Sequence, residues 1–288
     1  MMIKILTKNI NRITAITISE KYIAVARNRL IEIWDLKQSK PLKKQFKNEN
    51  IITNIVINKP NTKLIITSKN QIKVIEILTG KILQSFSIHN SNITAMSLSN
   101  KYLITADIDF NIVIWDLKQN ELHNLQDNKE IDRIQIIDDK EFITFNKTNR
   151  KLWDIEKLEL INNSDLKSLT ELITINQKNY AFNSDGKFIH FRDIEDDENI
   201  FHPNPEFLHK IALNRQNFHT IQINDEYYFA SIDKNNIIYL WNINKHQLLK
   251  EFVFFNDGNW VAIDKVKNTI TGSRKSKQYL DIKYENFI

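Results

Sequence analysis

The amino-acid sequence predicts an all-β fold made of seven similar units that follow one another along the chain. A short signature recurs about every forty residues, which indicates a repeat architecture. The segments between the signatures are four to six residues long and rich in β-branched and aromatic side chains, and Asn, Asp, Ser or Lys separates them, as is typical of strands. No unit carries the long 3.6-residue apolar period that is typical of a helix.

The signature consists of an apolar or aromatic residue, an acidic or amide residue, and then Leu or Ile. It is clearest as Trp34-Asp35-Leu36, Trp115-Asp116-Leu117 and Trp153-Asp154-Ile155. Further copies, some of them degenerate, begin at Ile75, Arg192, Trp241 and Leu280. Successive copies begin 38 to 41 residues apart, except for one interval of 49. This spacing predicts seven units in a single domain that spans residues 1–288.

The third unit illustrates the strands expected in each repeat. Its segments 93–98, 101–106, 111–115 and 121–125 are short and strand-like, and polar residues separate them. Four strands in about forty residues, with a Trp-Asp dipeptide, resemble the blade of a WD40 repeat protein. The resemblance covers essentially the whole chain and implies a seven-bladed β-propeller of four-stranded antiparallel blades.

The two ends of the chain are expected to pair with each other. Residues 3–6 precede the first unit with nothing of their own to pair with, and only six residues follow the last signature, Leu280-Asp281-Ile282. If the N-terminal strand completes the last blade, no strand edge stays exposed between the first and last blades. WD40 rings typically close in this way.

Two local features complete the comparison with WD40 proteins. The long interval between signatures contains residues 195–206, an acidic stretch with two prolines, which predicts an irregular insertion in the fifth blade. The C-terminal pattern resembles the last segment of many bacterial WD40 proteins, and consists of Asp257-Gly258, Trp260, Ser273 and Tyr279-Leu280.

Composition restricts the classes of function. The chain has no cysteine, so disulfides, thiolate metal sites and cysteine nucleophiles are excluded. The formal net charge of +5 is modest for a nucleic-acid-binding protein of 288 residues. No segment has the length and apolar character of a signal peptide or a membrane span. We therefore expect a cytoplasmic protein without metal or cofactor.

The third unit also contains a polar set that the WD40 resemblance assigns to a buried hydrogen-bonded network: His89, Thr105, Asp109 and Trp115. The same residue types are compatible with a catalytic triad, but no oxyanion-hole glycine or nucleophile elbow accompanies them. We therefore expect a structural network and no catalytic residue.

Basic residues recur in the turns between the second and third strands of several units. These turns are expected on one face of the ring, and their basic residues are Arg27, Arg29, Lys69, Arg150, Arg274, Lys275 and Lys277. Charge complementarity favours an acidic protein surface as the partner. An ordinary solvated surface of a Lys-rich chain remains the alternative.

The WD40 resemblance implies a non-catalytic scaffold for protein–protein interactions, such as an assembly or accessory factor of a larger complex. The alternative is a nucleic-acid-binding propeller that uses the basic face. Few aromatic residues accompany the basic turns, which disfavours single-strand binding.

Overall fold

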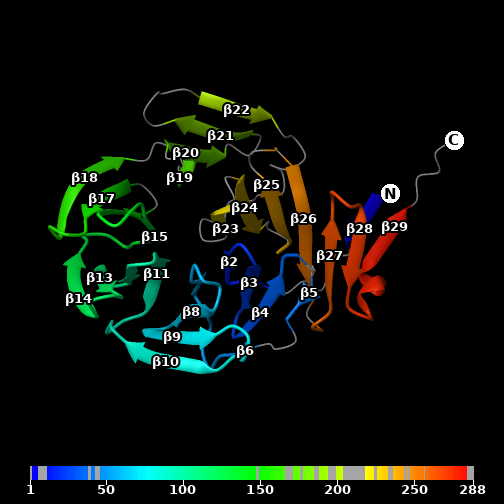
Figure 1. Ribbon diagram of the computed structural model, residues 1–288, viewed down its shortest axis with the longest axis horizontal. Coiled ribbons are helices and arrows are strands. Elements are labelled where there is room, and N and C mark those ends of the chain that lie inside the picture. The colour runs from blue at the N-terminus through cyan, green and yellow to red at the C-terminus, as the bar shows by residue number, and fades with distance from the viewer. Residues whose placement is uncertain are drawn as a thin grey trace.

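A computed structural model describes most of the chain, namely residues 2–5, 12–37, 40–42, 46–146, 149–165, 171–175, 178–184, 188–193, 199–203, 218–223, 226–232, 236–242, 245, 247–255 and 257–283. These residues confirm the predicted all-β class. Helix is limited, in these ranges, to one 3-10 turn, η2 (Ser276–Tyr279). The strands form antiparallel sheets that follow one another along the chain (Figure 1).

The first sheet contains β2 (Ala15–Ile18), β3 (Tyr22–Arg27), β4 (Leu30–Asp35), β5 (Lys40–Pro41) and β6 (Phe46–Lys47). The short strands β5 and β6 both pair with β4, so together they take the place of a fourth strand. The second sheet has four strands: β7 (Asn54–Ile57), β8 (Lys63–Ser68), β9 (Gln71–Glu76) and β10 (Ile82–Ser87).

The next three sheets each have four strands in chain order. The third contains β11 (Ile93–Leu98), β12 (Tyr102–Asp107), β13 (Asn111–Asp116) and β14 (Glu121–Gln126). The fourth contains β15 (Arg133–Ile136), β16 (Glu141–Phe145), β17 (Asn149–Asp154) and β18 (Glu159–Asp165). The fifth contains β19 (Glu171–Ile175), β20 (Lys178–Ser184), β21 (Phe188–Asp193) and β22 (Asn199–Pro203). Of the predicted insertion 195–206, residues 199–203 form β22, and the remainder lies outside the described residues.

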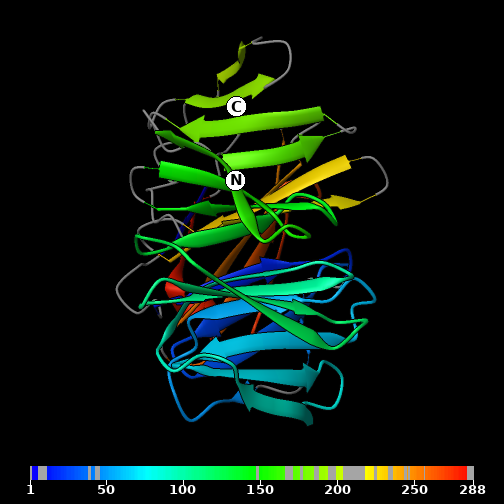
Figure 2. The same cartoon turned by 90° about the vertical axis from the view of Figure 1, so that its left-hand side faces the viewer.

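Neighbouring sheets pack face to face, with their first strands side by side. Strand β2 contacts β7 and β23, and β11 contacts β7 and β15. Apolar clusters fill the spaces between the first and second, second and third, and third and fourth sheets. Figure 2 shows the sheets layered one above another. Because both faces of a sheet are covered, all six residues of β3 and of β12 are buried, whereas most residues of the outer strands β10 and β14 are exposed.

The last unit differs from the prediction of seven four-stranded blades. The sixth sheet has six strands: β23 (Phe218–Ile223), β24 (Glu226–Ile232), β25 (Ile238–Asn242), β26 (Gln247–Phe254), β27 (Trp260–Asp264) and β28 (Thr269–Gly272). The last two strands belong to the seventh repeat, yet they extend the sixth sheet through β26. The physical reason is the apolar second half of β26, where Phe252, Val253 and Phe254 are buried. An edge this apolar is stabilised when another strand covers it.

The expected pairing of the chain ends is present in part. Strand β1 (Met2–Ile5) pairs antiparallel with β29 (Leu280–Lys283), and Ile3 lies opposite Ile282. These two strands form a separate two-stranded sheet, so they do not complete a four-stranded unit with β27 and β28. None of the sheets closes on itself, and a seven-bladed propeller is not confirmed.

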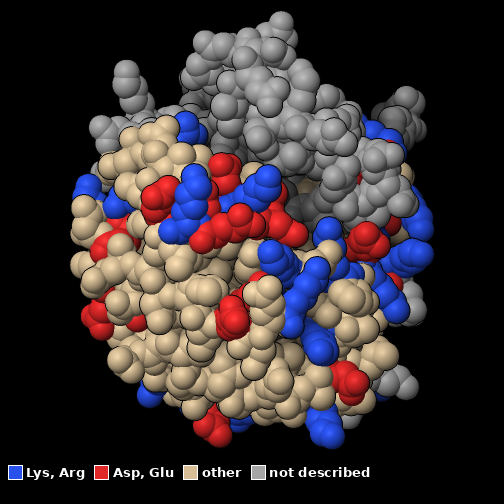
Figure 3. Space-filling view, turned by 60° about the vertical axis from the view of Figure 1, so that its left-hand side comes forward, with Lys and Arg blue, Asp and Glu red and all other residues tan. Residues whose placement is uncertain are grey.

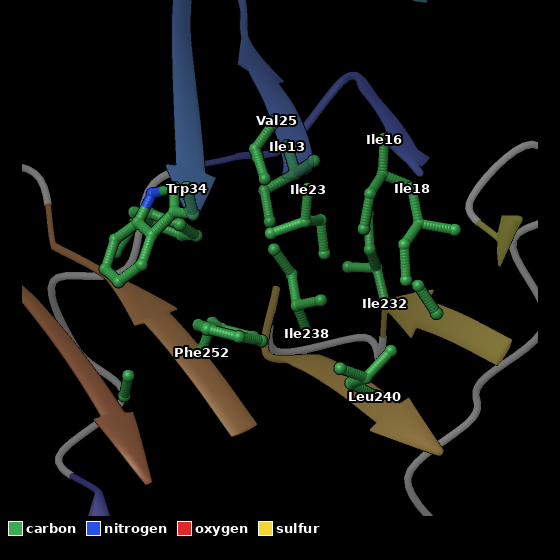
Figure 4. Packing of buried hydrophobic residues seen from close by; sticks show 13 residues of the cluster. Ile13, Ile16, Ile18, Ile23, Val25, Trp34, Ile232, Ile238, Leu240 and Phe252 are labelled. Carbon is green, nitrogen blue, oxygen red and sulfur yellow. The ribbon is translucent and has the colours of Figure 1, made fainter. Parts of the chain in front are cut away.

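The sixth sheet packs directly against the first through a large apolar cluster (Figure 4). Isoleucines of β2 and β3 face Ile232, Ile238 and Leu240 of the sixth sheet. Trp34 of β4 lies at one side of this cluster, with Phe252 and Phe254 in edge-on contact at 5.5 and 5.0 Å between ring centroids. This cluster joins two sheets that lie far apart in the sequence.

Candidate protein-binding surface

Tight turns present basic side chains at one end of the first two sheets. Asn28 follows β3 and Lys69 follows β8, and both have left-handed backbone conformations, with φ of 56° and 53°. Their carbonyl oxygens accept hydrogen bonds from the amides of Ile52 and Ile93, at 2.7 and 2.8 Å. Each turn is thereby attached to the connection that leads to the next sheet. The side chains of Arg29 and Lys69 are exposed at this end of the molecule.

Arg27 does not belong to the exposed set, in contrast to the sequence prediction. Its side chain is 3% exposed and forms an ion pair with the equally buried carboxylate of Glu32, with Nη2 2.5 Å from Oε1. Its Nη1 atom also donates a hydrogen bond to the carbonyl oxygen of Phe255, at 3.4 Å. Arg27 therefore links the first sheet to the β26–β27 turn and is not available to a partner.

The β26–β27 turn also contacts the segment that carries the C-terminal basic residues. Phe255 stacks on Tyr279 with ring centroids 4.0 Å apart. The Tyr279 hydroxyl donates a 2.6 Å hydrogen bond to Oδ2 of Asp257, and this bond lowers the pKa of Asp257 and raises that of Tyr279. Ser273 Oγ donates to Oδ1 of Asn259 at 2.7 Å. Residues 273–279 are therefore held against the turn, and the basic residues within this segment are exposed: Arg274, Lys275 and Lys277.

Two further exposed basic residues lie beside these turns. Lys47 on β6 pairs with Leu30 at the start of β4, and Arg12 precedes residues 13 and 14, whose backbone bonds to Asn236 and Ala26. We call the exposed set the basic end: Arg12, Arg29, Lys47, Lys69, Arg274, Lys275 and Lys277. Glu49 and Asp257 are exposed acidic residues beside it. Sequence analysis missed Arg12 and Lys47 because neither lies between second and third strands.

Arg150 lies apart from the basic end. It is half-buried in β17 of the fourth sheet, opposite Ser164 of β18. The third sheet lies between this strand and the second sheet, and its turn carries the acidic residues Asp107 and Asp109. The structure therefore brings five of the seven predicted residues together, without Arg27 and Arg150.

The polar set of the third sheet forms a buried row of hydrogen bonds with a different carboxylate from the one expected. His89 Nδ1 lies 2.9 Å from Oδ2 of Asp107, and its Nε2 lies 2.8 Å from Oγ1 of Thr105. Asp109 is exposed, and only its backbone amide bonds to Asp107. The indole N–H of Trp115 donates to Asn120 at 3.2 Å instead of joining this row. The row differs from the predicted network at Asp109 and Trp115.

Burial shapes the ionisation of this row. Desolvation lowers the pKa of His89, against the opposing effect of the hydrogen bond to Asp107. Desolvation alone would raise the pKa of Asp107, but hydrogen bonds from Asn111 and His89 hold it below its ordinary value. His89, Thr105 and Asp107 are at most 5% exposed. A substrate cannot reach this row, which satisfies buried polar groups as such networks do.

In the second and fourth sheets, other buried polar pairs occupy the place that the His89 row takes in the third sheet. In the second sheet, Lys73 Nζ donates to Oδ1 of Asn48 at 2.8 Å. In the fourth sheet, Lys151 forms a buried ion pair with Asp127, and the indole N–H of Trp153 donates to Thr144 at 2.9 Å. These pairs are buried in the same way and are therefore structural.

No group of three potential metal-ligating side chains occurs among the residues that the structure describes. The described part of the chain also contains no helix that is long and apolar enough to cross a membrane. What the geometry offers is a charged surface on a rigid set of turns, which is suited to binding a macromolecule of opposite charge.

Comparison with protein families corrects the identification made from the repeats. Residues 28–157 match the family model of the DNA polymerase III psi subunit, and not that of a WD40 repeat family. The matched segment extends from the β3–β4 turn through β17. The WD40 identification is therefore wrong, and so is the WD40 scaffold function that we derived from it. No curated protein matches the chain. The family match covers 130 of the 288 residues, slightly less than half of the chain.

Proposed function

We propose that this chain is a non-catalytic subunit that binds other proteins of a DNA polymerase III assembly. The observation that carries the proposal is the match of residues 28–157 to the psi subunit of that polymerase. The buried His89 row supports a role without catalysis, since its groups are inaccessible to substrate. A subunit of a replication complex would act in the cytoplasm of a bacterial cell.

The basic end is the proposed docking surface. Three of its residues, Arg29, Lys47 and Lys69, lie in the matched segment and are exposed. The turns that carry two of them are attached by backbone hydrogen bonds to the next connection, so the charges are presented at little entropic cost. The partner that fits is an acidic protein segment, whose charge would increase the association rate and specificity.

A binding experiment with purified components tests this proposal. The full chain is immobilised and mixed with the purified subunits of DNA polymerase III from the same cells. We expect at least one subunit to bind, and we expect a variant with Arg29, Lys69, Arg274 and Lys275 changed to Glu to bind it at least tenfold more weakly. A matched control reverses four exposed lysines outside the basic end: Lys63, Lys81, Lys118 and Lys140.

The outcomes separate the function from the surface. If none of the subunits binds, the proposed function is wrong. If a subunit binds both variants as tightly as the unchanged chain, the function stands and the docking surface lies elsewhere. Retention that depends on nucleic acid, with a steep loss of binding as salt rises, would instead indicate nucleic-acid binding.

A further inference from the structure

The outer edge of the second sheet is an uncovered strand. β10 pairs with β9 on one side and is the last strand of its sheet. Its other edge therefore presents backbone N–H and C=O groups that no strand among the described residues pairs. Two of its apolar side chains are well exposed, Ile82 at 50% and Leu83 at 40%. Such an edge is a template for a further strand.

β10 lacks the features that protect the outer strands of the first, third and fourth sheets from edge pairing. The six residues Ile-Leu-Gln-Ser-Phe-Ser contain neither a charge nor a proline. In contrast, β14 carries Glu121, β18 carries Glu159 and Asp165, and β5 is two residues long and ends in proline. Charges, prolines and short length are the usual means of keeping strand edges apart.

The geometry of β10 leaves its second half free to pair regularly. A bulge lies between Ile82 and Gln84, and from Gln84 to Ser87 the strand follows β9 in unbroken register. Phe86 is held in place by edge-on contact with Trp115 of the third sheet, at 4.8 Å between ring centroids. The pairing segment is thus regular in register and anchored to the neighbouring sheet.

We propose that two copies of this chain associate through antiparallel pairing of β10 with β10, with Ser85 opposite its own copy and Gln84 opposite Phe86. A strand that pairs with its own copy brings like side chains close together, and like charges opposite one another are destabilising. The uncharged β10 avoids this repulsion in every register. Figure 3, in which the left-hand side of Figure 1 comes forward, shows a broad area without Lys, Arg, Asp or Glu on the face turned towards the viewer. A second copy of the chain fits this neutral edge, whereas an acidic partner fits the basic end.

Sedimentation equilibrium of the full chain over a wide concentration range tests the proposal. We expect the mass to rise with concentration from 34.1 kDa towards twice that value. Gln84→Lys places a charge on the edge and should weaken the dimer at least tenfold. The matched control is Asn124→Lys on the outer strand β14, because Gln84 lies opposite Val74 and Asn124 lies opposite Val113 in their sheets. Both positions are exposed, so neither change should prevent folding.

Chemical cross-linking gives a second and more local measurement. The chain has no cysteine, so Gln84→Cys introduces a single reactive thiol. A short bis-maleimide cross-linker should join two Gln84→Cys chains and leave Asn124→Cys chains unjoined. A chain that stays monomeric at all concentrations overturns the proposal. A dimer that Gln84→Lys leaves intact, or that both lysine variants weaken equally, also overturns it. None of these results bears on polymerase subunit binding, which uses other residues.

Discussion

Arg27 and Glu32 form an ion pair inside the protein, where their side chains are 3% and 4% exposed. Arg27 ends β3 and Glu32 lies within β4, and the guanidinium also lies over the ring of Phe254, 5.3 Å from its centroid. A basic residue beside a turn, which the sequence places on the surface, thus helps to join the first and sixth sheets.

Removing this arginine should be costly. Arg27→Met takes the positive charge away from a buried carboxylate, and we expect the free energy of unfolding to fall by about 3–5 kcal/mol. Arg27→Met combined with Glu32→Leu should recover most of the loss, because apolar residues often replace a buried ion pair without penalty. Urea denaturation followed by tryptophan fluorescence measures both. Equal losses in the single and double variants would show that the charge of Glu32 is not the cause.

Trp34 should be a major source of stability at the contact between the first and sixth sheets. It is fully buried and meets Phe252, Phe254 and Trp260 edge-on, the last at 4.5 Å between ring centroids. Trp34→Ala should lower the free energy of unfolding by about 3–5 kcal/mol. The half-buried Trp115 is the comparison, and Trp115→Ala should cost clearly less in the same denaturation experiment.

His89 should make stability depend on pH. Burial lowers its pKa from the ordinary value of 6.5, so the unfolded chain binds this proton more readily than the folded protein. Its contribution is therefore complete above pH 6.5 and is lost as the pH falls through the folded pKa. His89→Asn, which copies Asn48 of the second sheet, should flatten the stability curve between neutral pH and about pH 5. Urea denaturation of both chains at a series of pH values measures this slope.

Replacing Lys69 with Asn should increase the stability of the protein. Its φ of 53° is costly for most side chains, whereas Asn tolerates this conformation and occupies the equivalent turn position at Asn28. Lys69→Asn should therefore raise the free energy of unfolding by up to about 1 kcal/mol, while it removes one charge from the basic end. Thermal unfolding and polymerase subunit binding, measured on the same variant, should move in opposite directions. A loss of stability would contradict this account of the turn.

The sequence by itself determined the strands and their order. Short runs rich in β-branched and aromatic residues, separated by Asn, Asp, Ser or Lys, place strands such as β11 and β12 without any tertiary information. The spacing of the signatures likewise predicts four-stranded units, which the second to fifth sheets show. Local chemistry also placed basic residues in the turns after β3 and β8, because turn positions depend on neighbouring residues alone.

Tertiary structure decided which of these residues reach the surface and which sheet each strand joins. Arg27 ends β3 and Arg29 lies two residues later in the turn, yet packing against the sixth sheet buries Arg27 and leaves Arg29 exposed. Similarly, the apolar end of β26 attracts β27, so a strand of the seventh repeat joins the sixth sheet. The carboxylate beside His89 is that of Asp107, and not that of Asp109 as predicted. Both are aspartates, so the residue type could not distinguish them, whereas their distance from His89 and their burial do. Such choices depend on contacts between segments far apart in the chain, which periodicity and composition do not encode.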